Sequence, residues 1–343
     1  MTSERIVLDG DIQVLLSHMV LWGLAAICED MELPGILASW SDTPTPQPIL
    51  HVDASKDDVA QAVIDHATRS ADHDSWLSKT TCVSADGKRA VALAAPRTAA
   101  PANDEIWRRV DEEHCALLDD LESRLDQRLL LGFGYRSWWA VERSGKIRAD
   151  FGCNAWEMRT RNNGTDVVKD RLLPLAREVQ AWSISEVLDG LTGTRLNDVV
   201  GKNDAMSHTG TGFCLPQPVD NARAWCALWG LANLPVMAHT SRGVVSPALL
   251  SASDIPGQNR RHLVMFGSRR PMTLARARAI LRSSQLPQAS APESVDAGQF
   301  RRAVGWCRAH GVDIAIRFPV DVVGSASAPE RRALHGQVVP WSA

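Results

Sequence analysis

The most regular hydrophobic pattern in the chain is helical and covers residues 103–127. Apolar side chains recur there at the spacing of one helix face, at Ile106, Val110, Leu117, Leu121 and Leu125, and the other positions are strongly charged. Asn103 can cap the first turn, because its side chain can accept a hydrogen bond from the backbone. The pattern predicts one long amphipathic helix.

Two further helices are apolar on nearly every side, so they must be buried. The first is predicted at residues 11–30 and contains LWGLAA, and the second at residues 220–234 contains LWGLAN. The glycine in each phrase permits another backbone or a tryptophan to approach closely, although it costs the helix about 1 kcal/mol relative to alanine. We therefore expect both phrases to be packing elements that could lie beside each other in one core.

The remaining patterns are shorter. Strands are predicted at residues 6–8, 49–52, 129–134, 137–141, 262–266 and 312–318, with a further candidate at 146–151. Helices are predicted at residues 56–69, 170–188 and 273–284, and another one ends near residue 310. Residues 94–104 and 286–293 have linker composition, and the C-terminal residues read as a polar tail. The prediction is an α+β fold of mixed helices and short antiparallel sheets, including ferredoxin-like elements.

Charge is distributed unevenly, although the net charge of the whole chain is only −3. Residues 1–130 contain 23 acidic and 11 basic side chains, whereas residues 131–343 contain 17 acidic and 26 basic ones. We interpret these as an acidic α/β half and a basic α+β half, with a boundary that the sequence does not fix. Such asymmetry favours either a polyanionic partner for the basic half or an assembly in which the acidic half meets a basic neighbour.

Arginine supplies most of the positive charge, since only 6 of the 37 basic residues are lysine. Residues 258–310 contain ten arginines against Glu293 and Asp296. The guanidinium fork suits phosphate, and arginines in loops can bind a phosphate backbone without reading its sequence. The candidate contacts are Arg260, Arg261, Arg269, Arg270, Arg278 and Arg282. The alternative is an ordinary solvated surface in an arginine-rich proteome.

A second candidate surface is YRSWWAVERSGKIR at residues 135–148, where basic residues alternate with tryptophans. Aromatic rings beside positive charge suit single-stranded nucleic acid, because bases stack on the rings while cations follow the backbone. Neighbouring strand residues point to opposite faces, so only one of the two tryptophans can serve. The candidates are Arg136, Trp138, Lys146 and Arg148, extended by Arg159 and Arg161 of a polar loop. The alternative for the tryptophans is core packing.

Signatures of catalysis are weak. His66 and the DHD at residues 72–74 suggest a metal-dependent hydrolase, but no further ligands follow at a recognisable spacing. The alternative is that these residues are solvated at a helix end. Two GxG triplets, at residues 132–134 and 210–212, complete no nucleotide-binding loop, and no GxSxG motif is present. A noncatalytic protein without cofactor or metal is expected. The alternatives are a hydrolase that uses His66, Asp72 and either His73 or His208, and a scaffold that binds only protein.

The sequence also predicts the compartment. Its seven cysteines include no CxxC pair, which favours reduced thiols. The first residues are acidic and lack a cleavage pattern, and the apolar run at residues 19–28 is shorter than the roughly 20 residues of a membrane span. A cytoplasmic protein without membrane contact is expected.

Three patches of the chain resemble subunits of type I CRISPR effector complexes. They are the early apolar helix with its glycine, the paired tryptophans, and GFCLPQPVDNARAWCALWGLANLPV at residues 212–236. The resemblance is nearest to the poorly characterised type I-G (formerly I-U) subunits, and more distant to the large subunit that recognises the motif flanking the target. It implies a noncatalytic subunit that joins guide RNA and other subunits in a surveillance (Cascade) complex and helps to engage target DNA in antiviral defence. The glycine-rich loop of repeat-associated RNA-binding subunits is not clearly present, so no guide processing is implied.

Overall fold

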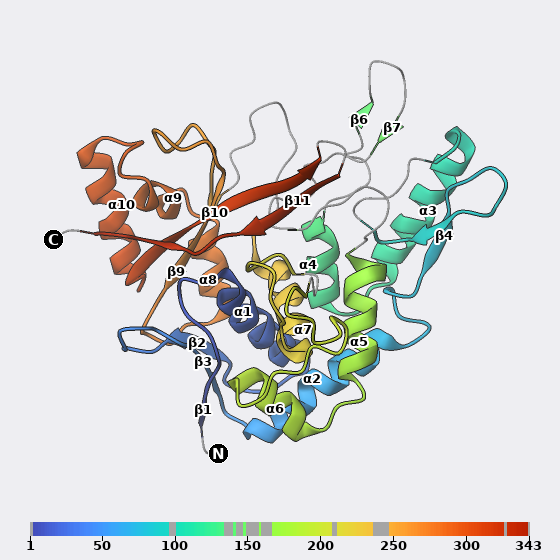
Figure 1. The fold of residues 1–343 in the computed structure, drawn as a ribbon, viewed down its shortest axis with the longest axis horizontal. Coiled ribbons are helices and arrows are strands. Elements are labelled where there is room, and N and C mark those ends of the chain that lie inside the picture. Colours follow the sequence, from blue (N-terminus) through green and yellow to red (C-terminus); the bar gives the residue numbers. More distant parts are fainter. Residues whose placement is uncertain are drawn as a thin grey trace.

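Helix α1 (Leu15–Asp30) runs through the centre of the protein and carries the first LWGLA phrase (Figure 1). The computed structural model describes residues 3–95, 101–133, 140–141, 147–148, 158, 167–207, 211–235, 247–325 and 328–341. Every residue of α1 from Leu15 to Cys28 is buried, as its apolar pattern predicts. No side chain caps the first turn of α1, so tertiary packing holds this helix.

The first 71 residues form a βαββα unit around α1. Strands β1 (Glu4–Val7), β2 (Leu37–Trp40) and β3 (Pro48–Val52) are ordered β1-β3-β2, and both pairings are antiparallel. Strand β3 therefore separates β1 from β2, which is the connectivity that begins a ferredoxin-like fold. Helix α2 (Lys56–Ala71) follows and starts with a capping box between Ser55 and Asp58.

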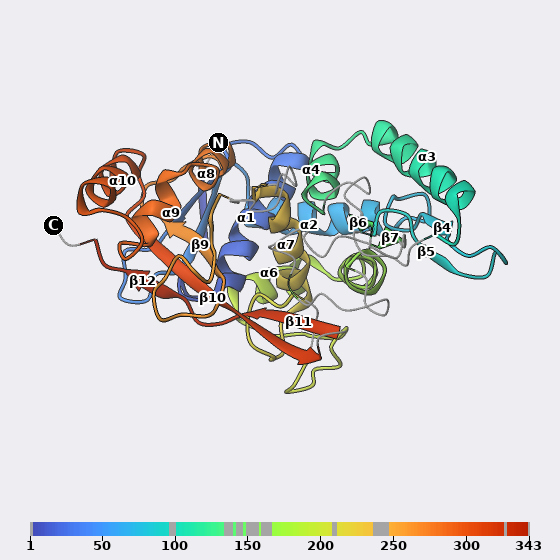
Figure 2. The same ribbon diagram turned by 90° about the horizontal axis from the view of Figure 1, so that it is seen from above.

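The C-terminal residues form a second antiparallel sheet. Its strands are β8 (Leu249–Leu250), β9 (His262–Gly267), β10 (Ile314–Ser325), β11 (Ala328–Ala333) and β12 (Gln337–Val339). The order is β11-β10-β9-β8, with β12 also paired to β10. Helices α8 (Leu274–Leu281), α9 (Gln285–Ser290) and α10 (Ala297–Ala309) connect β9 to β10 and lie together toward one end of the molecule (Figures 1 and 2).

Backbone hydrogen bonds join the two sheets. Ala38 of β2 exchanges hydrogen bonds of 2.9 and 3.0 Å with Met272, and the Trp40 amide donates to the Ser268 carbonyl at 2.7 Å. The α+β fold predicted from the sequence is thus confirmed.

The middle of the chain is mainly helical. It contains α3 (Asp104–Asp120), α4 (Arg124–Phe133), a π-helical turn (Val168–Leu172), α5 (Leu173–Val179), α6 (Ile184–Thr192), α7 (Asn221–Trp229) and the 3-10 turn η3 (Gly230–Asn233). Four short strands form two hairpins, β4 (Thr80–Cys82) with β5 (Ala90–Ala92), and β6 (Ala140–Val141) with β7 (Ile147–Arg148).

Several predicted elements are wrong in this structure. The single helix at residues 103–127 is broken, because Leu121 is extended and Ser123 starts α4. The strand at residues 129–134 is wrong, since residues up to 133 belong to α4. The helix at residues 170–188 is divided at residues 180–183, where Ser183 caps α6. The linker at residues 286–293 includes α9, and the polar tail contains β11 and β12.

Helices α1 and α7 approach to backbone contact at the two repeated glycines. A Cβ atom on Gly23 would lie 1.7 Å from the Cys226 carbonyl oxygen, and a Cβ on Gly230 would lie 2.5 Å from the Met19 carbonyl oxygen. Both distances are far below van der Waals contact, so only glycine fits at either position. The prediction that the two LWGLA phrases pack beside each other is confirmed.

Residues on both sides of position 130 share one hydrophobic core. Helix α1 packs on α7, and α2 packs on α5 and α6, so elements of the acidic half contact elements of the basic half. The predicted boundary at residue 130 marks a change of charge, and the core does not divide there.

Alanine in place of Gly23 should lower the free energy of unfolding by about 3 kcal/mol or more, because its Cβ meets rigid backbone on α7. Gly305→Ala in α10 is the matched control, since nothing lies within 4 Å of a Cβ there. This control should be neutral or stabilise by up to about 1 kcal/mol. Chemical denaturation measures both variants, and equal effects would contradict the close crossing.

Candidate functional site

The predicted nucleic-acid contacts fall into two groups in the structure. Arg136, Trp138, Lys146, Arg159 and Arg161 lie outside the described residues. For Arg148 the backbone is described, as part of β7. The six candidate arginines within residues 260–282 are all described, and their surroundings differ.

Two of these six arginines form ion pairs at the surface. The Arg269 guanidinium lies 3.2 Å from the Asp42 carboxylate and 3.6 Å from that of Asp313. These carboxylates, Asp313 foremost, raise the pKa of Arg269 above its ordinary value. Arg260 pairs with Asp321 at 3.3 Å. Nearby carboxylates thus partly neutralise both side chains.

Arg278 is a structural residue. Its Nε donates a hydrogen bond of 2.8 Å to the Asn233 side chain, and its guanidinium lies 3.4 Å from Glu29. Only 12% of the side chain is exposed, and burial is the main cause that lowers its pKa. The prediction that Arg278 is a phosphate contact is therefore wrong, because its side chain is turned inward and connects α8 to η3 and α1.

Arg261, Arg270 and Arg282 are exposed, and none of them has an ion pair within the part of the chain that the structure describes. Arg301 and Arg302 on α10 are also exposed, but the Asp296 carboxylate at the start of this helix interacts with both of their charges. These five arginines come from the elements gathered toward one end of the molecule around β9, α8 and α10 (Figure 2). They provide positive charge that is available to an anion.

His66 is a core residue. It lies in α2 with its ring centroid 5.4 Å from that of Trp225 and 4.5 Å from that of Trp229. Neither of its ring nitrogens has a hydrogen-bond partner among the described residues, and burial lowers its pKa to about 3. The neutral ring therefore packs as an aromatic group, and the prediction of a solvated helix-end residue is wrong for His66.

Asp72, His73 and Asp74 directly follow α2, and all three are exposed. Their ligand atoms lie within 4.8 Å of one another, and this is the only such group that the described residues contain. It does not include His66, while His208 lies outside the described residues. The histidine and aspartate ligands proposed for a hydrolase are thus not brought together around His66.

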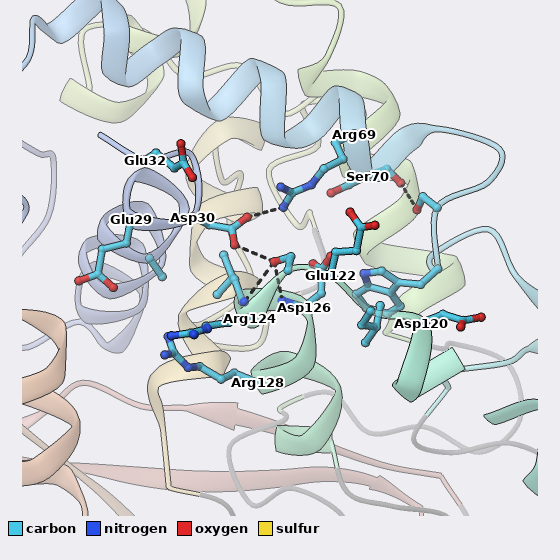
Figure 3. A pocket seen from close by; sticks show the side chains of 16 residues that line it. Glu29, Asp30, Glu32, Arg69, Ser70, Asp120, Glu122, Arg124, Asp126 and Arg128 are labelled. Atoms are coloured by element: carbon cyan, nitrogen blue, oxygen red, sulfur yellow. Dashed lines mark hydrogen bonds and ion pairs between the residues drawn. The ribbon is translucent and has the colours of Figure 1, made fainter. Parts of the chain in front are cut away.

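A polar pocket of about 690 Å³ lies where the C-terminal ends of α1 and α2 meet the start of α4 (Figure 3). Six carboxylates and three guanidinium groups line it, together with Trp76. The charged residues are Glu29, Asp30, Glu32, Asp120, Glu122, Asp126, Arg69, Arg124 and Arg128. The sequence analysis did not find this pocket, although the acidic run at residues 119–126 supplies three of the carboxylates.

Asp30 organises the inner wall of this polar pocket. Its carboxylate accepts hydrogen bonds from Arg69 and, at 2.7 Å, from the Ser123 hydroxyl. Ser123 in turn accepts from the backbone amides of Leu125 and Asp126 at 3.1 and 3.2 Å, which caps α4. Although burial acts to raise it, the bonds from Ser123 and Arg69 hold the pKa of Asp30 below its ordinary value.

Asp126 has fewer partners than Asp30. Only 9% of this residue is exposed, and its Oδ1 atom has no hydrogen-bond partner among the described residues. Burial raises its pKa to about 6, although the Arg69 charge and a hydrogen bond from Trp76 oppose the shift. Arg69 thus faces two largely buried carboxylates, Asp30 and Asp126, and forms its hydrogen bond with Asp30.

No protein-family model matches the chain, and no curated protein matches it. Among the described helices, none is both long and apolar enough to cross a membrane. None of the six cysteines that the structure describes is in a disulfide, as their spacing predicts.

The stability of the fold should depend on Asp126. Its pKa is about 6 when folded against an ordinary value of 3.8, so the folded state binds this proton more tightly. The contribution of the protonated carboxyl is complete below about pH 4 and is lost as the pH rises through 6. Asp126→Asn cannot ionise, so its stability relative to wild type should increase by about 2 kcal/mol between pH 4 and pH 7.5.

Denaturation at a series of pH values measures this difference. Asp74→Asn is the control, because it removes the same charge from an exposed position. If the free energies of unfolding of Asp126→Asn and wild type differ by the same amount at every pH, the raised pKa of Asp126 is contradicted.

Proposed function

We propose that this protein is a noncatalytic nucleic-acid-binding subunit of a type I CRISPR surveillance (Cascade) complex. In this role it contributes to guide RNA or target DNA binding and to assembly of the ribonucleoprotein complex in antiviral defence in the cytoplasm. Its partners are guide RNA or target DNA and other subunits of the effector complex.

The observation that carries the proposal is the set of exposed arginines without carboxylate partners among the described residues. They are Arg261, Arg270 and Arg282. Guanidinium groups that are not neutralised by the protein itself can bind phosphate oxygens, whichever base is attached. This favours a backbone contact without sequence reading. The resemblance of the LWGLA segments to type I subunits supports the setting in an effector complex.

Adjacent arginines allow a matched test. Arg261 and Arg270 have no described ion pair, whereas their neighbours Arg260 and Arg269 each pair with aspartate. We expect Arg261→Gln/Arg270→Gln to weaken binding of a 30-nucleotide RNA or DNA and to reduce the salt slope by roughly 1.5 to 2. Arg260→Gln/Arg269→Gln removes the same formal charge and should have a clearly smaller effect, because these arginines are already partnered.

Fluorescence anisotropy between 50 and 300 mM salt measures both slopes with single-stranded RNA, single-stranded DNA and duplex DNA. A wild-type protein that binds none of them at low salt contradicts the proposal. If both double variants lose the same affinity for nucleic acid, Arg261 and Arg270 contribute no more to binding than the ion-paired Arg260 and Arg269.

A further inference from the structure

We infer that the polar pocket at the ends of α1, α2 and α4 is a docking site for a positively charged side chain, arginine or lysine, carried by a basic segment of a partner protein. This inference rests on the pocket alone and does not require that the protein binds nucleic acid. It concerns the acidic half, and the exposed arginines take no part in it.

The charges of the inner wall are unbalanced. Asp30 and Asp126 are both largely buried, and Arg69 is the guanidinium that faces them. Arg69 forms its hydrogen bond with Asp30, which leaves the Oδ1 atom of Asp126 without a described partner. A buried carboxylate without enough donors is unfavourable, and a second cation in the pocket would correct this.

The other two guanidinium groups of the pocket do not supply that cation. Figure 3 shows Arg124 and Arg128 extending to one side, away from Glu122 and Asp126. Glu122 and Asp126 lie near Asp30 toward the middle of the pocket in the same view. The negative side chains are therefore the ones presented to an incoming group.

The shape and lining of the pocket favour a side chain that enters from another protein. Its volume of about 690 Å³ is larger than one arginine needs, so neighbouring residues of the same segment also fit. Acidic residues at the opening, Glu32, Asp120 and Glu122, can receive further positive charges. The indole of Trp76 lines the pocket beside Asp126, and an aromatic wall next to carboxylates suits a guanidinium or ammonium group.

The pocket is a poor place for a metal ion. Among the described residues, only Asp72, His73 and Asp74 form a group of three ligands close enough to share one ion. No three of the described carboxylates in the pocket come that close to one another. Such spacing suits an extended cation with several donors, as in the guanidinium group.

The inference is tested with the full-length protein and an acetylated, amidated peptide of alternating glycine and arginine that contains three arginines. Isothermal titration calorimetry at pH 7.5 should show saturable binding, and the same peptide with citrulline in place of arginine should not bind. Asp126→Asn should weaken binding about tenfold or more, because it removes the buried charge. Glu122→Gln, at the exposed opening, should weaken it less.

Three controls distinguish binding in the pocket from binding elsewhere on the protein and from loss of the fold. Asp74→Asn removes an exposed carboxylate outside the pocket and should leave the affinity unchanged. The Arg261→Gln/Arg270→Gln variant should bind the peptide as wild type does, even if it loses nucleic acid. Asp126→Asn retains its fold if its thermal transition at pH 7.5 is not below that of wild type.

Several results would overturn the inference. They are the absence of saturable peptide binding, equal binding of the citrulline peptide, and unchanged affinity in a folded Asp126→Asn variant. Tighter binding of spermidine than of the arginine peptide would assign the pocket to a free polyamine and remove the protein partner. Affinity should also fall between pH 7.5 and pH 5 as Asp126 takes up its proton, whereas constant affinity would contradict a role for this carboxylate.

Discussion

The backbone contact between α1 and α7 at Gly23 and Gly230 is the constraint on which the other parts of the structure depend. It places residues that are about 200 positions apart in the sequence in one core. Asn233 then donates to the Trp22 carbonyl at 2.9 Å and accepts from Arg278, which attaches α8 to the same crossing. On the other side of α7, Trp225 and Trp229 enclose His66 of α2. The α1–α7 crossing therefore also positions two neighbouring helices, α8 and α2.

The unequal charges of the two halves are partly satisfied within the molecule. Arg223 pairs with Asp9, Arg269 with Asp42 and Arg278 with Glu29, and each pair joins the basic half to the acidic half. Two sets of charges are left over by this pairing. Positive charge remains on exposed arginines toward one end, and negative charge remains in the polar pocket beside α4. Both proposals, nucleic acid for the first and a basic segment for the second, follow from what the internal ion pairs do not neutralise.

Local patterns in the sequence predicted the buried helices and β9, because each is a continuous apolar run, and α2, because its apolar residues recur on one helix face. The strand predicted at residues 129–134 was wrong, because an apolar run as short as residues 129–131 occurs both in strands and in buried helix turns. Ion pairing of the arginines could not be predicted, because it depends on carboxylates such as Asp42 that are distant in sequence. The polar pocket could not be predicted either, because its lining residues come from α1, α2 and α4, which are distant in sequence and meet only in the folded chain.

Hydrogen exchange in the native state tests most directly whether the α1–α7 crossing unites both halves in one cooperative core. The measurement compares the opening free energies of the slowest amides in α1 with those in α7. A single core predicts equal values, both matching the free energy of global unfolding. If α7 opens at a clearly lower free energy while α1 stays protected, the single cooperative core is contradicted and the two halves unfold separately.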